Sequence, residues 1–125
     1  MQNLIGRYSL KSHGTYDSNN NFKRTSDYLK GELIYSESGA MSVIIFFKEV
    51  PETSRDFLAY SGTFKILNSK ELVHQISICS NPKRDNTDEN RSYLLIENNF
   101  KLSVDLGEGS RFGAIWEKLW YLNFK

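Results

Sequence analysis

Apolar and polar residues alternate along much of the chain, with the period of two that is typical of β-strands with one buried face. The alternation is clearest at 100–106, where Phe, Leu, Val and Leu are separated by Lys101, Ser103 and Asp105. No stretch shows the period of 3.6 that would indicate an amphipathic helix. The pattern predicts eight strands, at residues 4–12, 31–35, 40–47, 57–67, 72–79, 90–97, 100–106 and 112–119.

A short turn at 36–39 joins the second and third predicted strands. Gly39 suits the left-handed conformation that closes such a hairpin, and pairing Ser36 with Ala40 sets the register. Ile44 and Phe46 then fall on the outer face. The residues that share the opposite face are almost all apolar, so we expect this face to point inward: Leu33, Tyr35, Met41, Val43, Ile45 and Phe47.

Two asparagines, Asn98 and Asn99, suit a two-residue hairpin turn between the sixth and seventh strands, because asparagine tolerates positive φ. This register places Arg91, Tyr93 and Leu95 on the same face as the apolar residues of 100–106. In the first strand we expect Tyr8, Leu10 and Ser12 to share a face. The polar stretch 80–89 is interpreted as a solvated loop.

Short connections and regular hairpin spacing indicate an all-β fold, either a sandwich or an eight-stranded antiparallel up-and-down barrel. We favour the barrel because closure leaves no edge strands, and eight strands leave room for side chains or one small ligand. The length of 125 residues fits a single domain spanning 1–125.

Charge and composition exclude several classes of function. The formal net charge is +1, and Lys83, Arg84 and Arg91 are interspersed with acidic residues, so no basic stripe predicts nucleic-acid binding. Cys79 is the single cysteine, no apolar run is long enough to span a membrane, and no apolar leader follows Met1. We therefore expect a soluble cytoplasmic protein without membrane or nucleic-acid partners.

Several segments resemble the bacterial and fungal lipocalin-like domain family, which belongs to the calycin-type β-barrels. These are 6–10 (GRYSL, with Tyr8 in place of the usual Trp), 31–35 (GELIY) with 39–43 (GAMSV), 59–64 (AYSGTF), His74, Arg91, Leu102 and 116–118 (WEK). Their order and spacing cover nearly the whole chain. The resemblance implies a barrel that binds a small ligand or, as in some relatives, takes part in small-molecule biosynthesis.

Polar residues on the inward faces are the candidate ligand-binding groups. His74 alternates with Leu72, Ile76 and Ile78, and Arg91 would favour a carboxylate or another anion. The structural alternative is that Arg91 ties a strand end, or pairs with Glu117, and that a backbone carbonyl satisfies His74. Tyr8, Phe64 and Trp116 are expected to be core. The full candidate set is His74, Arg91, Tyr93, Tyr60, Tyr35 and Met41.

We thus expect a barrel that binds a small, partly apolar molecule, an anion among the candidates. One alternative is an isomerase- or cyclase-type enzyme with His74 as general acid or base. Another is an interaction module, such as a homodimer, that uses Ile44, Phe46 and the tail 120–124. We expect no metal or other cofactor, because His13, His74 and Cys79 lack metal-ligand spacing and the glycines of 107–113 lack a dinucleotide-binding pattern.

Overall fold

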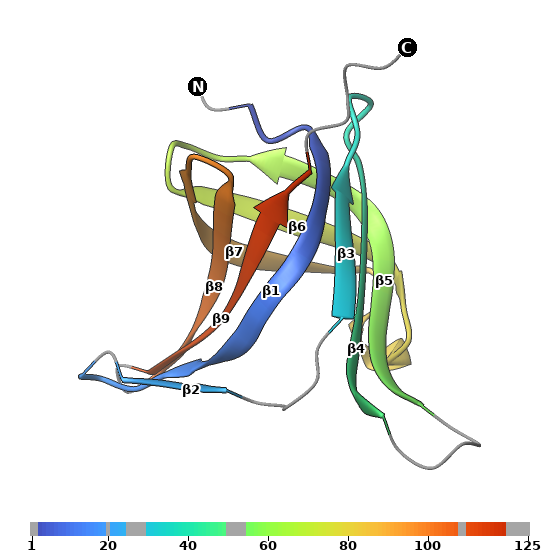
Figure 1. Ribbon diagram of the computed structural model, residues 1–125. Helices are drawn as coiled ribbons and strands as arrows, with labels where there is room; N and C mark the ends of the chain where they lie inside the picture. The colour runs from blue at the N-terminus through green and yellow to red at the C-terminus, as the bar shows by residue number, and fades with distance from the viewer. Residues whose placement is uncertain (1–2, 20, 25–29, 50–54, 108–109, 120–125) are drawn as a thin grey trace.

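Eight antiparallel strands form a closed barrel in the computed structural model, which describes residues 3–19, 21–24, 30–49, 55–107 and 110–119 (Figure 1). Each strand pairs with the next, and the last pairs with the first, which closes the ring. A short strand, β2, pairs with the far end of β1 and with no other strand among the described residues. The elements are β1 Gly6–Tyr16, β2 Phe22–Arg24, β3 Lys30–Tyr35, β4 Ala40–Glu49, β5 Arg55–Ile66, β6 Glu71–Cys79, the 3₁₀ turn η1 Pro82–Arg84, β7 Thr87–Ile96, β8 Asn99–Gly107 and β9 Ser110–Lys118.

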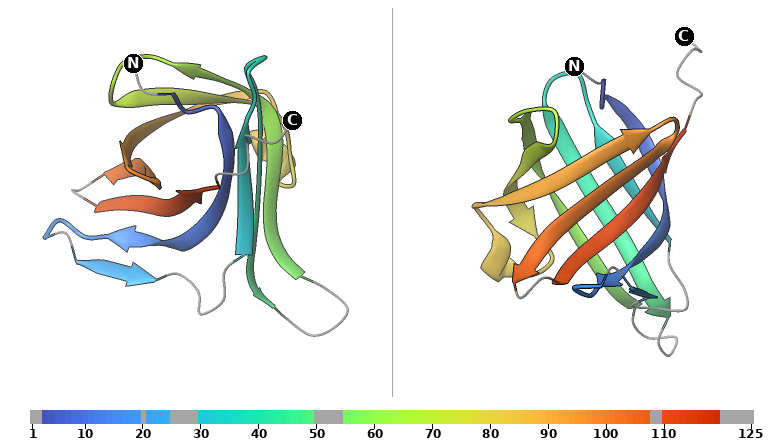
Figure 2. Two further views of the ribbon diagram at one scale, coloured as in Figure 1. Left: turned by 45° about the horizontal axis from the view of Figure 1, so that its top comes forward. Right: turned by 90° about the vertical axis from the view of Figure 1, so that its left-hand side faces the viewer.

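The barrel confirms the predicted fold class. Its strands curve around a common interior (Figure 2), and inward-facing side chains alternate with outward-facing ones along the strands except at β-bulges. None of the described residues belongs to a helix long and apolar enough to span a membrane. The tail at 120–124 lies outside the described residues, so its predicted role as an interaction surface stays a prediction.

One end of the barrel, here called the floor, is filled by large side chains. The Tyr8 hydroxyl donates to the carbonyl oxygen of Leu4 at 2.7 Å, and the Lys118 Nζ donates to that of Asn3 at 3.1 Å. The Tyr8 ring lies 5.1 Å from that of Phe100, centroid to centroid. These contacts leave room for a guest molecule only nearer the opposite end. The largest fully buried side chains are Trp116, Tyr8, Tyr35, Phe100, Leu4, Leu33, Leu72 and His74.

The hairpin between β3 and β4 has the predicted register. The Ser36 amide donates to the carbonyl oxygen of Ala40 at 2.9 Å, and Gly39 has a φ of +93°. Ile44 and Phe46 lie on the outer face, half-buried, and the Phe47 side chain lies outside the described residues. The other predicted inward residues are buried: Leu33, Tyr35, Met41, Val43 and Ile45.

The turn between β7 and β8 lies one residue earlier than predicted. Its central residues are Glu97 and Asn98, because Ile96 pairs with Asn99 and Glu97 has the positive φ of 55°. Moving a two-residue turn by one position changes the register by two residues. The side chains therefore keep their predicted faces, since the period of a strand is two.

Two β-bulges correct the predicted faces. In β1, Leu10 pairs with Trp116 and Ser12 with Ile115, so Lys11 is an extra residue. The inward face therefore passes to His13 and Ser12 turns outward, contrary to the prediction.

In β6, Ile78 pairs with Ser61 and Ile76 with Gly62, so Ser77 is an extra residue. Ile78, predicted to face inward with His74, is 62% exposed, and Cys79 is buried in its place. A bulge adds one residue to one strand and thereby reverses the alternation beyond it.

Candidate functional site

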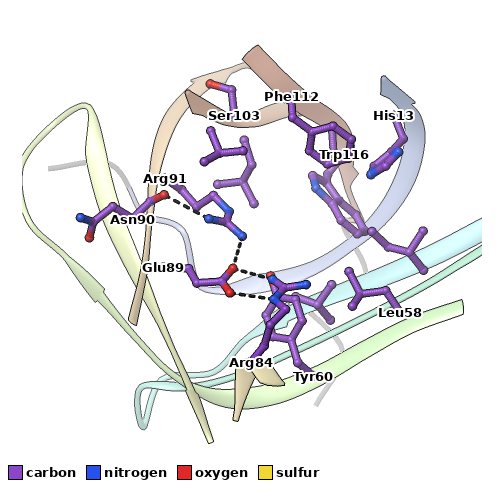
Figure 3. Close-up of a pocket in the computed structure, with 15 residues that line it drawn as sticks. His13, Leu58, Tyr60, Arg84, Glu89, Asn90, Arg91, Ser103, Phe112 and Trp116 are labelled. Carbon is purple, nitrogen blue, oxygen red and sulfur yellow. Dashed lines mark hydrogen bonds and ion pairs between the residues drawn. The ribbon is translucent and has the colours of Figure 1, made fainter. Parts of the chain in front are cut away.

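A cavity of about 550 Å³ lies in the barrel interior between the filled floor and the end that carries η1 (Figure 3). Its volume falls in the range usual for small-molecule sites. Strands β1, β4, β5, β7, β8 and β9 all contribute side chains, and η1 adds one. The lining residues are His13, Val43, Ile45, Leu58, Tyr60, Arg84, Glu89, Asn90, Arg91, Leu102, Ser103, Val104, Phe112, Ala114 and Trp116.

Most of the cavity wall is aliphatic or aromatic. The inward-facing side chains of β4, β8 and β9 supply most of this surface, since alternate residues of a strand point to the same side of the sheet. Such a wall favours an apolar ligand body, since removing apolar surface from water is favourable by about 25 cal/mol per Å². The apolar lining residues are Val43, Ile45, Leu58, Leu102, Val104, Phe112, Ala114 and Trp116.

Two arginines and one glutamate form a charged group on one side of the cavity. Arg84 donates to the Glu89 carboxylate from Nε at 2.7 Å and from an Nη at 2.5 Å. Arg91 donates to the same carboxylate at 2.6 Å and to the carbonyl oxygen of Asn90 at 3.1 Å. Two positive charges and one negative charge leave this side with a net charge of +1.

The Glu89 carboxylate is ionised throughout the physiological range. Burial alone would raise its pKa, but the hydrogen bonds and charges of Arg84 and Arg91 outweigh burial and lower the pKa to about 2. The three side chains are 15–26% exposed, so water screens the pair only in part. This side of the cavity therefore attracts anions.

The prediction that 80–89 is a solvated loop is wrong for Arg84 and Glu89, whose side chains turn toward the barrel interior. Strand β7 begins at Thr87, and Glu89 pairs with His74, which turns its side chain inward. The Thr87 hydroxyl donates to the carbonyl oxygen of Arg84 at 2.7 Å, and the Asp85 carboxylate accepts from a backbone amide of β6 at 2.7 Å. These bonds hold the segment against the barrel, so Arg84 and Glu89 are only partly exposed.

Tyr60 connects the cavity to a buried hydrogen-bonded chain. Its hydroxyl lies 2.8 Å from His74 Nδ1, and the Tyr35 hydroxyl lies 2.6 Å from His74 Nε2. The Arg84 guanidinium lies over the Tyr60 ring, 5.2 Å from its centroid. Burial, together with the nearby positive charge of Arg91, lowers the pKa of His74 to about 3, so the imidazole is neutral.

Of the six residues predicted to bind a ligand, Arg91 and Tyr60 line the cavity. His74 and Tyr35 lie behind Tyr60, with exposed fractions of 0% and 1%. Met41 is buried in the core, and the Tyr93 hydroxyl donates to the carbonyl oxygen of Asn68 at 2.9 Å, next to the turn before β6. None of these last four belongs to the cavity lining in the described part of the chain.

The buried position of His74 bears on the alternative enzyme hypothesis. Both of its ring nitrogens are bonded to tyrosine hydroxyls rather than to the backbone carbonyl considered from the sequence. A general acid or base must reach the reacting proton directly or through one water. His74 reaches the cavity only through Tyr60, so the geometry offers it no direct contact with a ligand.

The lining residues that sequence reasoning missed include Arg84, Glu89, His13 and, as a cavity residue, Trp116. Extending the alternation of Arg91 and Tyr93 backward by one step would have identified Glu89, whereas the bulge that turns His13 inward has no evident sequence signal. The His13 ring lies edge-on to that of Phe112 at 4.3 Å, and burial lowers its pKa to about 4.

Other polar residues of the barrel are placed away from the cavity. Glu117 is exposed on the outer face of β9, so Arg91 pairs with Glu89 instead. Cys79 is a free, buried thiol. No group of three histidine, cysteine or acidic side chains that could hold a metal ion occurs among the residues that the structure describes.

No protein-family model matches the chain, and no curated protein matches it. The fold and the cavity therefore provide the evidence on function.

Proposed function

We propose that the barrel binds a small, mostly apolar molecule that carries an anionic group, and that Arg91 and Arg84 hold this group. The observation that supports the proposal best is the combination of an apolar cavity of about 550 Å³ with one charged side whose net charge is +1. The apolar wall would bury the body of the ligand. The arginines would orient it by its charge.

The guanidinium groups have donors to offer a ligand. Each guanidinium carries five N–H groups, and the bonds to Glu89 and Asn90 use two of them on each arginine. Charge-assisted bonds to a carboxylate are about twice as strong as neutral ones and are often bidentate, which favours a planar carboxylate as the anionic group.

Membership of the bacterial and fungal lipocalin-like domain family, and with it the calycin type, forms part of this proposal. The closed barrel supports it, as does the order of the motifs from 6–10 to 116–118. We also propose a cytoplasmic location, because the free Cys79 fits a reducing compartment.

The test compares a medium-chain fatty acid with the primary alcohol of the same length, by calorimetric titration. We expect the acid to bind more tightly, and Arg91→Met to weaken the acid about tenfold or more while leaving the alcohol within about twofold. Lys65→Met is the matched control, since Lys65 is an exposed cation on the barrel surface. If no acid binds, or if the two variants behave alike, the proposal is wrong.

A second test fills the cavity. Ala114→Phe would place a ring in the cavity, and we expect it to abolish binding of acid and alcohol alike. Ile115→Phe is the control on the outer face of the same strand and should leave both affinities unchanged. Ligand binding that survives Ala114→Phe would show that the ligand occupies another site.

A further inference from the structure

Trp116 places a hydrogen-bond donor without a partner in the cavity wall. Its Nε1 is buried and has no hydrogen-bond partner among the residues that the structure describes. The side chain lines the cavity, and Figure 3 shows the nitrogen-bearing edge of the indole on the side that faces the charged group. Native proteins satisfy nearly all buried polar groups, so an exception inside a cavity indicates a group that a ligand completes.

The wall of the ligand-free cavity covers the Trp116 nitrogen. The Trp116 nitrogen has almost no exposed surface, and its neighbours in the wall are mostly aliphatic or aromatic. A ligand oxygen would reach the nitrogen when a lining side chain changes rotamer, a common adjustment on binding.

Tyr60 presents a second donor, beside Arg91. The Tyr35 hydroxyl is buried, and its only polar partner in the described chain is His74 Nε2. A buried hydroxyl proton needs an acceptor, so the Tyr35 O–H donates to this nitrogen. The neutral imidazole then carries its proton on Nδ1 and donates to the Tyr60 oxygen. In this tautomer His74 Nδ1 donates to the Tyr60 oxygen, and the Arg91 guanidinium can only donate. Neither His74 nor Arg91 therefore accepts the proton of the Tyr60 hydroxyl, which is left to donate to a ligand.

We infer that the ligand is an oxygenated apolar acid: its carboxylate accepts from Arg91 and Tyr60, and an uncharged oxygen elsewhere on its body, such as a ketone carbonyl, accepts from Trp116. The inference rests on the proposed function and adds the second acceptor. A saturated fatty acid would fill the cavity but leave the Trp116 N–H unsatisfied, whereas an oxo acid would satisfy it.

The test titrates the protein with tetradecanoic acid and with a series of its oxo analogues, the ketone moved stepwise along the chain. We expect at least one analogue to bind about threefold to tenfold more tightly than the parent acid, the range for one neutral hydrogen bond. In Trp116→Phe, which keeps an apolar ring and removes the donor, the ratio of the two affinities should fall to about one, whatever the affinity of the variant for the parent acid.

A second measurement needs no variant of Trp116. The indole N–H signal of Trp116 in ¹H–¹⁵N spectra, assigned with Trp120→Phe, should move downfield with the preferred oxo acid and not with the parent. If the parent acid binds but no analogue is preferred, or if the preference persists in Trp116→Phe, this inference is wrong and the proposed function stands. If no acid binds at all, both are wrong.

Discussion

At the scale of single residues, His74 is held between the hydroxyls of Tyr35 and Tyr60 and does not line the cavity. The two tyrosine hydroxyls on its ring nitrogens predict one tautomer, with the proton on Nδ1. We expect ¹⁵N spectra at pH 7 to show a protonated Nδ1 and an unprotonated Nε2. In Tyr35→Phe the donor to Nε2 is gone, so the tautomers should mix, whereas Tyr93→Phe should leave the signals unchanged. A proton found on Nε2 in the wild type would contradict this assignment.

Under the proposed function, Glu89 would compete with the anionic group of a ligand for the arginine donors. Replacing it in Glu89→Gln removes the negative charge, so the net charge of the group rises from +1 to +2, and Arg84 and Arg91 lose their ionic partner. We expect a fatty acid to bind about threefold to tenfold more tightly by calorimetry. The free energy of unfolding in urea should fall by about 1–2 kcal/mol, since the pair is only partly exposed. Glu117→Gln, on the outer face, should change neither quantity.

At the scale of elements, the bulge in β6 requires a glycine opposite it. A Cβ added at Gly62 would lie 2.0 Å from the carbonyl oxygen of Gln75, a backbone atom that cannot move freely. We expect Gly62→Ala to destabilise the protein by about 2–4 kcal/mol. A Cβ added at Gly39 would have no atom within 4 Å, and only the φ of +93° would be unfavourable for alanine. We therefore expect Gly39→Ala to lower the free energy of unfolding by about 1–2 kcal/mol. Equal losses in urea unfolding would show that the close approach at Gly62 is relieved elsewhere.

The strands and their inward faces were predictable because the alternation of apolar and polar residues and the position of each turn both limit the possible register. The β7–β8 turn was displaced by one residue and still left Tyr93 and Leu95 on the inner face, since the register moved by two. The bulges were not predictable: Lys11 and Ser77 are polar residues within strands, as many are, and nothing local marks them as extra. Each changes the face of the residues beyond it.

The candidate site was predictable only in part, for a related reason. Arg91 and Tyr60 lie on strands whose alternation is clear, and both line the cavity. Arg84 and Glu89 lie in a run of polar residues that is typical of a loop. The hydrogen bonds around η1 hold Arg84 against the barrel, and the pairing of Glu89 with His74 turns the Glu89 side chain inward. Composition alone cannot distinguish a charged loop that faces water from one that faces a cavity.

At the scale of the whole molecule, the barrel separates a filled floor from a cavity. Aromatic rings from β1, β3 and β8 pack at the floor, and the charged group lies toward η1. The carboxylate of a bound acid would lie on the η1 side, with its apolar body against the walls of β4, β8 and β9.

Two buried histidines make the stability of the barrel depend on pH. Burial lowers the pKa of His13 to about 4 and that of His74 to about 3, whereas both histidines titrate near pH 6.5 in the unfolded chain. Below pH 6.5 the unfolded state therefore binds protons that the folded state does not. The free energy of unfolding should thus be fully retained above about pH 6.5 and should fall as the pH is lowered toward 4.

We expect the loss between pH 7 and pH 5 to be about 1–2 kcal/mol for each histidine, measured by urea unfolding at a series of pH values. Over this range Glu89 stays ionised in the folded state, because the arginines hold its pKa near 2. His13→Gln removes one of the two titrating groups. As the pH is lowered from 7 to 5, the free energy of unfolding of this variant should therefore fall about half as steeply as that of the wild type, whatever the stability of the variant at pH 7. A wild type whose stability is constant from pH 7 to 5, or a variant that matches its slope, would mean that the histidines take up protons in the folded barrel.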